Sequence, residues 1–310
     1  MKAFYPSTTD KIWHLGKNGN TYRLDSFDNP LRLLDVLGKY DQIDTEVVSI
    51  EGNTIPQAEA LINSVHNPNI SKAYKTGTPL TLAESSGVMY QPLLYDYALE
   101  SAVCSKLAYH AALKDKVAYS FTGGGHHCEK DRGLGFNIIN TIAIATQSAL
   151  NDKNKVAIID LDVHYSNGIF DILGGKNNVL CTGLWNKKID KWKYFESKGS
   201  IWHRKVDDTE NYFTHLNQLL ELILKFKPNV VLYHMGLDVL ETDRMGGIPR
   251  FTKDLLFKRE KLVRDSLRDH PYAIFRGGSY INYNQEKNKI EENKAYVTDL
   301  QAKMLELHAI

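Results

Sequence analysis

Beyond Tyr90, short apolar runs alternate with longer amphipathic segments. Val156–Ile159 has no polar interruption, which is typical of a strand that a parallel sheet buries on both faces. Asp208–Phe226, in contrast, carries leucines at helical spacing. Strands that alternate with helices of ten or more residues indicate βαβ units and a parallel sheet.

The pattern predicts an open parallel sheet with helices on both faces. The expected strands are Thr45–Ile50, Val117–Phe121, Val156–Asp160, Val179–Gly183, Val230–His234 and Tyr272–Phe275. The expected helices include Tyr90–Ala112, Asn137–Leu150, Asp208–Phe226, Lys253–Leu267 and Glu291–His308. Residues 1–30 are polar and turn-rich, and no strand is assigned there. No repeat or linker interrupts the chain, so we expect a single α/β domain over residues 1–310.

Charge and cysteine content narrow the range of partners and compartments. Lys plus Arg is 38 against 37 for Asp plus Glu, and this balance argues against electrostatically driven binding to nucleic acid or anionic membranes. The three cysteines form no CxxC pair, which favours a reducing compartment. The N-terminus lacks the apolar region of a signal peptide, and no window resembles a membrane span. We therefore expect a cytoplasmic protein.

Acidic and imidazole side chains follow the buried run at Val156. Asp160, Asp162 and His164 are spaced two apart, so they should converge beyond the carboxyl end of the strand, where open α/β sheets place ligands. Carboxylates and a histidine in this arrangement suit a divalent metal such as zinc. A strand end with solvated acids and a helix-capping Asn167 is the other interpretation, and this motif alone leaves both open.

Three other strand ends carry candidate chemistry. Tandem His126 and His127 follow a run of three glycines, and histidine can act as a general base near neutral pH. The loop after Val230–His234 offers possible third metal ligands, namely Asp238, Glu241 and Asp243. Tyr280 follows two glycines and a serine and could donate to a developing oxyanion. Each feature alone is also compatible with an ordinary surface loop or a packed tyrosine.

Taken together, these segments resemble the zinc-dependent histone deacetylase superfamily, which includes acetylpolyamine amidohydrolases. The matching blocks, in the order of the family, are GGGHHCEKDRGLGF, IIDLDVHYSNG, GLDVLETDRMGG and GGSY. The sequences DRGLGF and TDRMGGI are most similar to those of the class IV branch. The resemblance implies the arginase/deacetylase-like fold, while the segment before Tyr90 matches weakly.

The resemblance implies zinc ligands Asp162, His164 and Asp243. Three protein ligands and one open position are typical of a catalytic zinc. It further implies that His127 is the general base and acid, and that His126 is its electrostatic partner.

The remaining implied roles surround these groups. Asp160 would accept a hydrogen bond from His126 and offer its carbonyl to a structural potassium ion. Asn167 would orient His127 where some relatives have an aspartate, and Tyr280 would polarise the substrate carbonyl. Other residues are implied to bind substrate. They are Gly135 and Phe136, which would line the channel for the acyl-lysine stem, and Trp185 near the channel mouth.

The implied activity is zinc-dependent removal of an acyl group, acetyl or longer, from a lysine side chain of a protein or peptide, or from a similar primary amine. Acetylpolyamine hydrolysis is the nearest alternative. An arginase-like dinuclear hydrolase would need a further carboxylate after His164, where Tyr165 and Ser166 stand. A non-catalytic acyl-lysine binder is the alternative outside enzymes, although every proposed catalytic position holds a competent residue.

Overall fold

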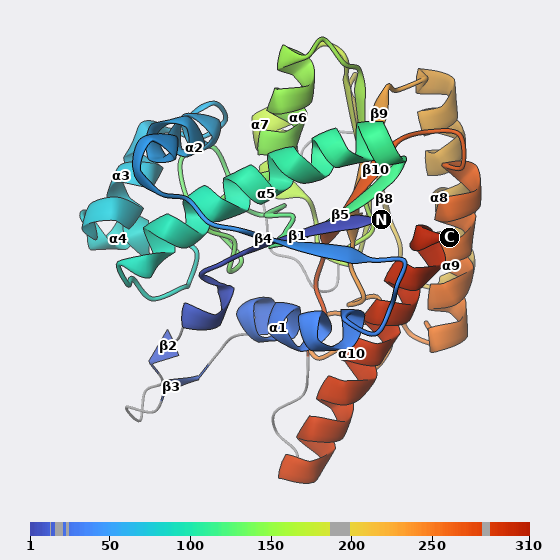
Figure 1. Cartoon of the computed structure of the whole chain (residues 1–310). Coiled ribbons are helices and arrows are strands. Elements are labelled where there is room, and N and C mark those ends of the chain that lie inside the picture. The colour runs from blue at the N-terminus through green and yellow to red at the C-terminus, as the bar shows by residue number, and fades with distance from the viewer. Residues whose placement is uncertain (13, 16–20, 23–24, 187–198, 281–285) are drawn as a thin grey trace.

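The computed structural model describes residues 1–12, 14–15, 21–22, 25–186, 199–280 and 286–310 (Figure 1). The strands are β1 (Lys2–Pro6), β2 (His14–Leu15), β3 (Thr21–Tyr22), β4 (Asp44–Val48), β5 (Val117–Gly123), β6 (Val156–Asp160), β7 (Val179–Trp185), β8 (Ile201–Lys205), β9 (Val230–Met235) and β10 (Tyr272–Arg276). The helices are α1 (Asp25–Leu37), α2 (Ile55–Asn63), α3 (Pro68–Thr76), α4 (Leu80–Ala83), α5 (Leu93–Asp115), α6 (Thr141–Asn151), α7 (Asn167–Leu173), α8 (Thr209–Phe226), α9 (Lys253–Ser266) and α10 (Lys287–Ala309). Two short 3₁₀ turns, η1 (Thr9–Lys11) and η2 (Gly52–Thr54), complete the elements.

Eight strands form one sheet in the order β4-β1-β5-β10-β9-β6-β7-β8, and all neighbouring pairs are parallel. The predicted fold class, an open parallel sheet flanked by helices, is confirmed. A second, two-stranded sheet pairs β2 with β3. All the expected strands belong to the large sheet. Strands β6, β7, β9 and β10 are buried along their whole length, as apolar runs in a sheet covered on both faces should be, whereas the edge strand β4 is mostly exposed.

Helices cover both faces of the sheet and create two apolar cores. Along β6, Val156 and Ile158 pack into the core on the side of α2, α3, α5, α6 and α7, whereas Ala157 and Ile159 face α1, α8, α9 and α10. Figure 1 shows α5 lying across one face, with α1 and α10 on the other. None of the described helices combines the length and apolar character that a membrane crossing requires.

Two strands of the large sheet were not expected, and one helix begins later than its apolar pattern indicated. Strand β1 lies within residues 1–30, where no strand was assigned, because its apolar residues are only the three between Lys2 and Pro6. Strand β8 was also missed: its side chains are mostly half-buried. Helix α6 begins at Thr141 rather than Asn137, because the side chain of Asn140 caps it by accepting from the backbone N–H of Ala143 at 2.9 Å.

The sheet order brings the chemistry-bearing segments together. Strands β5, β10, β9 and β6 are consecutive neighbours in the sheet, although they are far apart in sequence. Each is followed by one of the candidate motifs, and parallel strands end at the same edge. The four motifs therefore meet at one edge of the sheet.

A buried polar network contacts this edge of the sheet from the face that α9 and α10 cover. Arg259 donates to the carbonyl of Leu161 at 3.3 Å, in the segment between the two aspartates of the motif after β6. Arg259 Nε also donates to Glu260 at 2.6 Å, and His308 of α10 lies 2.9 Å from the other oxygen of Glu260. The arginine and the glutamate are fully buried. The last helix is thereby tied to the segment that carries the candidate metal ligands.

Candidate active site

The chain turns directly after β6, and the turn brings the three expected side chains together. Asp160 accepts from Nδ1 of His126 at 2.9 Å and from the hydroxyl of Ser166 at 2.6 Å. The other oxygen of Asp160 accepts the backbone N–H of Asp162 at 3.0 Å. His164 Nδ1 lies 2.8 Å from Asp162 Oδ1. The first carboxylate therefore organises the turn, and the second lies beside the imidazole of His164.

Asp162 and His164 form a potential metal site with Asp238. One ligand atom of each residue lies within 4.8 Å of the others. Asp162 and Asp238 are buried, and His164 is largely buried. Burial and the neighbouring Asp162 raise the pKa of Asp238 well above its usual value. Two carboxylates this close in a buried site repel each other, so a bound cation would stabilise the arrangement. The donor set, two carboxylates and an imidazole, fits zinc.

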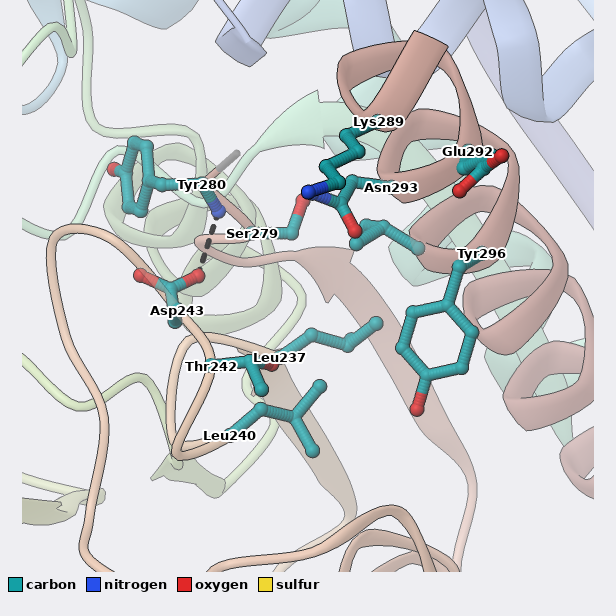
Figure 2. A pocket seen from close by; sticks show the side chains of 11 residues that line it. Leu237, Leu240, Thr242, Asp243, Ser279, Tyr280, Lys289, Glu292, Asn293 and Tyr296 are labelled. Carbon is teal, nitrogen blue, oxygen red and sulfur yellow. Dashed lines mark hydrogen bonds between the residues drawn. The ribbon is translucent and has the colours of Figure 1, made fainter. Parts of the chain in front are cut away.

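Asp243, which the resemblance implies as the third ligand, lies outside this group in the structure. Its Oδ1 accepts the backbone N–H groups of Met245 and Gly246 at 2.8 and 2.9 Å, and its Oδ2 accepts that of Tyr280 at 2.7 Å (Figure 2). Burial raises the pKa of Asp243 to about 7 against these backbone hydrogen bonds. Asp238, one of the ligands that the sequence left open, occupies the place beside His164, and the ligand role of Asp243 stays a prediction.

The two tandem histidines have opposite electrostatic environments. Their ring centroids are 4.1 Å apart. Burial alone would lower the pKa of His126, but the carboxylates of Asp160 and Asp162 outweigh it and raise the pKa to about 9. Burial and the neighbouring His126 lower the pKa of His127 well below its usual value. The first histidine is therefore cationic at neutral pH, and the second is neutral.

Asn167 determines the tautomer of His127. His127 Nδ1 lies 2.7 Å from the amide oxygen of Asn167, which can only accept, so Nδ1 carries the proton. The amide orientation is supported because Asn167 Nδ2 donates to the carbonyl of His127 and to the carboxylate of Glu129. In neutral His127 the other ring nitrogen, Nε2, then carries no proton and can accept one.

Tyr280 completes the group from the end of β10. Its ring makes an edge contact with His164, with centroids 6.2 Å apart. Burial, followed by the carboxylates of Asp162 and Asp238, raises the pKa of the phenol well above its usual value. The hydroxyl therefore stays protonated and can donate a hydrogen bond.

The reactive groups border a cavity of about 30 Å³. His126, Asp162 and Tyr280 line it together with Gly135 and Phe136. A larger cavity of about 390 Å³ lies on the α10 side of the loop at Tyr280, and Figure 2 shows the tyrosine ring pointing away from it. Size alone would select the larger cavity, but His126, Asp162 and Tyr280 meet at the smaller one.

Comparison with known proteins identifies the family of the chain. The histone deacetylase domain family model matches residues 31–292. The chain belongs to the histone deacetylase family. Histone deacetylase 2 of Arabidopsis thaliana is 29% identical over 184 residues, which are 56% of this chain and 47% of that protein. An uncharacterized protein of Picosynechococcus sp. is 28% identical over 227 residues, which are 71% of this chain and 75% of that one. The chain thus spans about half the length of the plant relative.

A solved structure of an acetylpolyamine aminohydrolase from Burkholderia pseudomallei superposes with a TM-score of 0.74. The superposition covers 98% of both chains at 18% sequence identity. It therefore shows that this histone deacetylase family member shares the fold of that enzyme.

In this family member, Gly135 and Phe136 are held in an unusual backbone conformation. Both have positive φ, and a Cβ on Gly135 would lie 2.4 Å from the ring of His127, so only glycine fits there. The backbone N–H of Phe136 donates to the carbonyl of Ser86 at 2.8 Å. The carbonyl of Gly135, expected to face substrate, accepts from Asn137 Nδ2 at 2.8 Å and keeps a second lone pair.

Trp185 does not line either cavity beside Tyr280 among the described residues. It is buried, packs edge-on against Tyr165 with centroids 5.1 Å apart, and donates to His203 at 3.2 Å. The described contacts of Trp185 are structural, and its predicted contact with substrate has no support from them.

Two residues near the reactive groups were missed by the sequence reasoning. His234, near the end of β9, is buried with Nε2 3.7 Å from Asp162, and the two form a second potential metal group with His126. Arg276 ends β10 and lines the same cavity as Tyr280. Their position at the ends of β9 and β10 was the available signal, because the neighbouring motifs lie at the same edge.

His66 holds the loop that carries Gly135. Its Nδ1 donates to the carbonyl of Glu129 at 3.0 Å, and its Nε2 accepts the backbone N–H of Asn140 at 2.9 Å. Burial is the main cause that lowers the pKa of His66 to about 4. A proton on Nε2 of His66 would point at the backbone N–H of Asn140, so the ring of His66 must be neutral in the folded chain.

We expect His66 to make stability depend on pH. The unfolded chain binds a proton below pH 6.5, whereas folded His66 stays neutral to about pH 4, so the stabilisation is complete above pH 6.5 and is lost as pH falls toward 4. In urea titrations, the difference in unfolding free energy between wild type and His66→Gln should shrink by about 2 kcal/mol between pH 7 and pH 5. His110 is exposed and provides the control His110→Gln. The assigned tautomer would be contradicted if the difference in unfolding free energy between wild type and His66→Gln did not change with pH.

Proposed function

We propose that this protein is a metal-dependent amidohydrolase that removes an acyl group from a lysine side chain or a similar primary amine. One observation carries the proposal: the neutral imidazole of His127, the phenol of Tyr280 and the buried group around Asp162 meet at one sheet edge. The histone deacetylase family supports it, and relatives in that family are named for deacetylation.

The metal is proposed to be zinc, held by Asp162, His164 and a carboxylate of the loop after β9. Buried carboxylates and an imidazole within ligand distance fit this ion. A bound zinc would act as a Lewis acid that acidifies a water molecule and polarises the substrate carbonyl. A potassium ion at the carbonyl of Asp160 remains an expectation from the family resemblance.

In the proposed reaction, His127 transfers protons and Tyr280 donates a hydrogen bond. Nε2 of His127 takes a proton from the attacking water, and burial together with cationic His126 keeps His127 neutral beforehand. Tyr280 donates its hydroxyl proton in a hydrogen bond to the oxygen that gains charge. His127 then returns the proton to the leaving amine. Asn167 keeps the same nitrogen available for both transfers.

A second candidate is an arginase-like dinuclear hydrolase. It is favoured by one observation: the two potential metal groups, His126 with His234 and His164 with Asp238, share the carboxylate of Asp162. Against it, the carboxylates of Asp160 and Asp162 outweigh burial and raise the pKa of His126 to about 9, so at neutral pH both of its ring nitrogens carry protons and Nε2 has no lone pair for a metal ion. We therefore propose one metal ion.

A hydrolysis screen tests the proposal directly. Acyl-lysine peptides, from acetyl to myristoyl, and acetylated polyamines are incubated with the metal-loaded protein, with and without chelator. Chelator-sensitive hydrolysis of a peptide or of a polyamine supports the amidohydrolase and selects the amine. Metal binding without hydrolysis of any substrate would instead favour the non-catalytic binder.

Replacing Tyr280 by phenylalanine is expected to leave metal content unchanged and to lower kcat by about 100-fold or more, because one oxyanion donor is lost. Steady-state kinetics and metal analysis of the same preparation measure both. Tyr296→Phe is the matched control, since this tyrosine of α10 is 44% exposed and lies on the larger cavity. A Tyr280→Phe protein with wild-type kcat would refute the assigned role.

A further inference from the structure

Arg276, the last residue of β10, is a cation buried behind the reactive groups. Only 5% of its surface is exposed. Its Nε donates to the carbonyl of Phe121 on the neighbouring strand β5 at 3.2 Å, which fixes the side chain against the sheet. Burial raises the pKa of Tyr280 and lowers the pKa of His234; the positive charge of Arg276 opposes the first shift and adds to the second. The guanidinium therefore belongs to the electrostatic environment of the site.

Two small cavities meet at this arginine. The first, of about 30 Å³, also contacts Asp162 and Tyr280. The second, of about 40 Å³, is lined by the hydroxyl-bearing residues Tyr97, Ser101 and Thr122 together with Arg276. The second cavity has a mixed lining, with apolar Ile138 and Ile139 beside the hydroxyl groups, and Arg276 lines both cavities. Each has room for at least one water-sized group.

Glycines keep the route between the metal group and the guanidinium open. A Cβ on Gly278 would lie 2.8 Å from Oδ2 of Asp162, and a Cβ on Gly123 would lie 3.5 Å from Nη2 of Arg276. Both positions therefore lack a side chain where one would narrow the space between these groups. Gly123 also lines both cavities, as do Phe136, Asn137 and Arg276.

The direction of a bound substrate follows from the proposed function. The amine arm would lie along Gly135 and Phe136, with the scissile carbonyl beside Asp162 and Tyr280. The far end of the acyl group would then extend toward Arg276. A carboxylate at that end can form charge-assisted, bidentate hydrogen bonds with a guanidinium, whereas an aliphatic end cannot.

We propose that Arg276 binds a carboxylate at the far end of the acyl group, so that the preferred substrates are amines acylated by a dicarboxylic acid. This inference rests on the proposed amidohydrolase function and specifies its acyl substrate. The reaction consumes one water: the amide C–N bond breaks, a C–O bond forms, and the dicarboxylate and the protonated amine leave. No oxidant or other co-reactant is needed.

The test compares acyl groups on one lysine peptide. Malonyl-, succinyl- and glutaryl-lysine are measured against butyryl-lysine, which lacks the second carboxylate. In wild type we expect kcat/KM for at least one dicarboxylic acyl group to exceed that for butyryl by about 10- to 100-fold, the factor of one charged hydrogen bond. Arg276→Met should remove this ratio, and Arg276→Lys should keep part of it. The control Arg268→Met alters an exposed arginine and should leave the ratio unchanged.

A binding measurement separates this inference from the proposed function. Calorimetry compares N-methylsuccinamate with N-methylbutyramide on metal-loaded wild type and on both Arg276 variants, with thermal unfolding as the check that each variant folds. Tighter binding of the charged amide that Arg276→Met abolishes supports the carboxylate site even without turnover. Butyryl hydrolysis equal to or faster than that of every dicarboxylic acyl group overturns the inference but leaves the amidohydrolase intact. Absence of hydrolysis of any acyl peptide contradicts the proposed function alone, and equal binding of the two amides then overturns the carboxylate site.

Discussion

Replacing His127 by glutamine is expected to lower kcat by about 1,000-fold, because it removes the general base and acid. Glutamine can still hydrogen-bond near Asn167, but its amide cannot accept a proton at neutral pH. The low pKa of His127, caused by burial and by cationic His126, means that the wild-type ring is already neutral and competent near pH 7. The loss should therefore appear in kcat across the neutral pH range rather than as a shift of the pH optimum.

Two control measurements accompany this prediction. His110→Gln changes an exposed histidine of α5 and should keep wild-type kcat. Metal content of His127→Gln should equal that of wild type, because His127 belongs to neither potential metal group in the described structure. If His127→Gln retained more than about a tenth of wild-type kcat, another residue would have to be the base.

Replacing Asp162 by asparagine is expected to remove the metal and, with it, activity. Asp162 is the one residue that both potential metal groups share, and the loss of a ligand should weaken affinity at least as much as the 10- to 100-fold typical of supporting residues. Metal per chain is measured after dialysis by elemental analysis, with one zinc expected in wild type. Asp299→Asn, an exposed acid paired with Lys303, is the control. Full metal occupancy in Asp162→Asn would contradict the site.

The same measurement identifies the third ligand. Asp238→Asn and Asp243→Asn are compared, because the structure groups the former with His164 while the family resemblance implies the latter. The aspartate whose substitution removes zinc is the third ligand. Two equivalents of metal in wild type would favour the dinuclear candidate, with Asp162 bridging both ions.

The motifs were recognisable in sequence because each lies directly after an apolar run. A run such as Val156–Ile159 is long enough to identify a buried strand, and parallel strands end at one edge. The expectation that Asp160 and His126 form a pair corresponds to the 2.9 Å contact between them. The strand at Lys2–Pro6, in contrast, has no sequence signal of its own, and its place between β4 and β5 depends on pairing with distant segments.

Side-chain contacts across long loops were beyond local patterns. Whether Asp238 or Asp243 faces His164 depends on how the loop after β9 folds against Gly246 and Tyr280. Trp185 was expected near substrate, but its surroundings are decided by packing against Tyr165. Hydrogen bonds and packing between segments far apart in the chain determine these placements, and no periodicity in the sequence records them.

The sequence by itself determined the α/β class, the parallel strands and the set of residue types that reach one edge of the sheet, because burial and side-chain alternation are local properties. Only the tertiary structure decided that β10 and β9 lie between β5 and β6, and that Arg276 and His234 thereby stand beside Asp162. Strand order is a global choice among pairings of similar local stability, so it was settled by the packing of the whole chain.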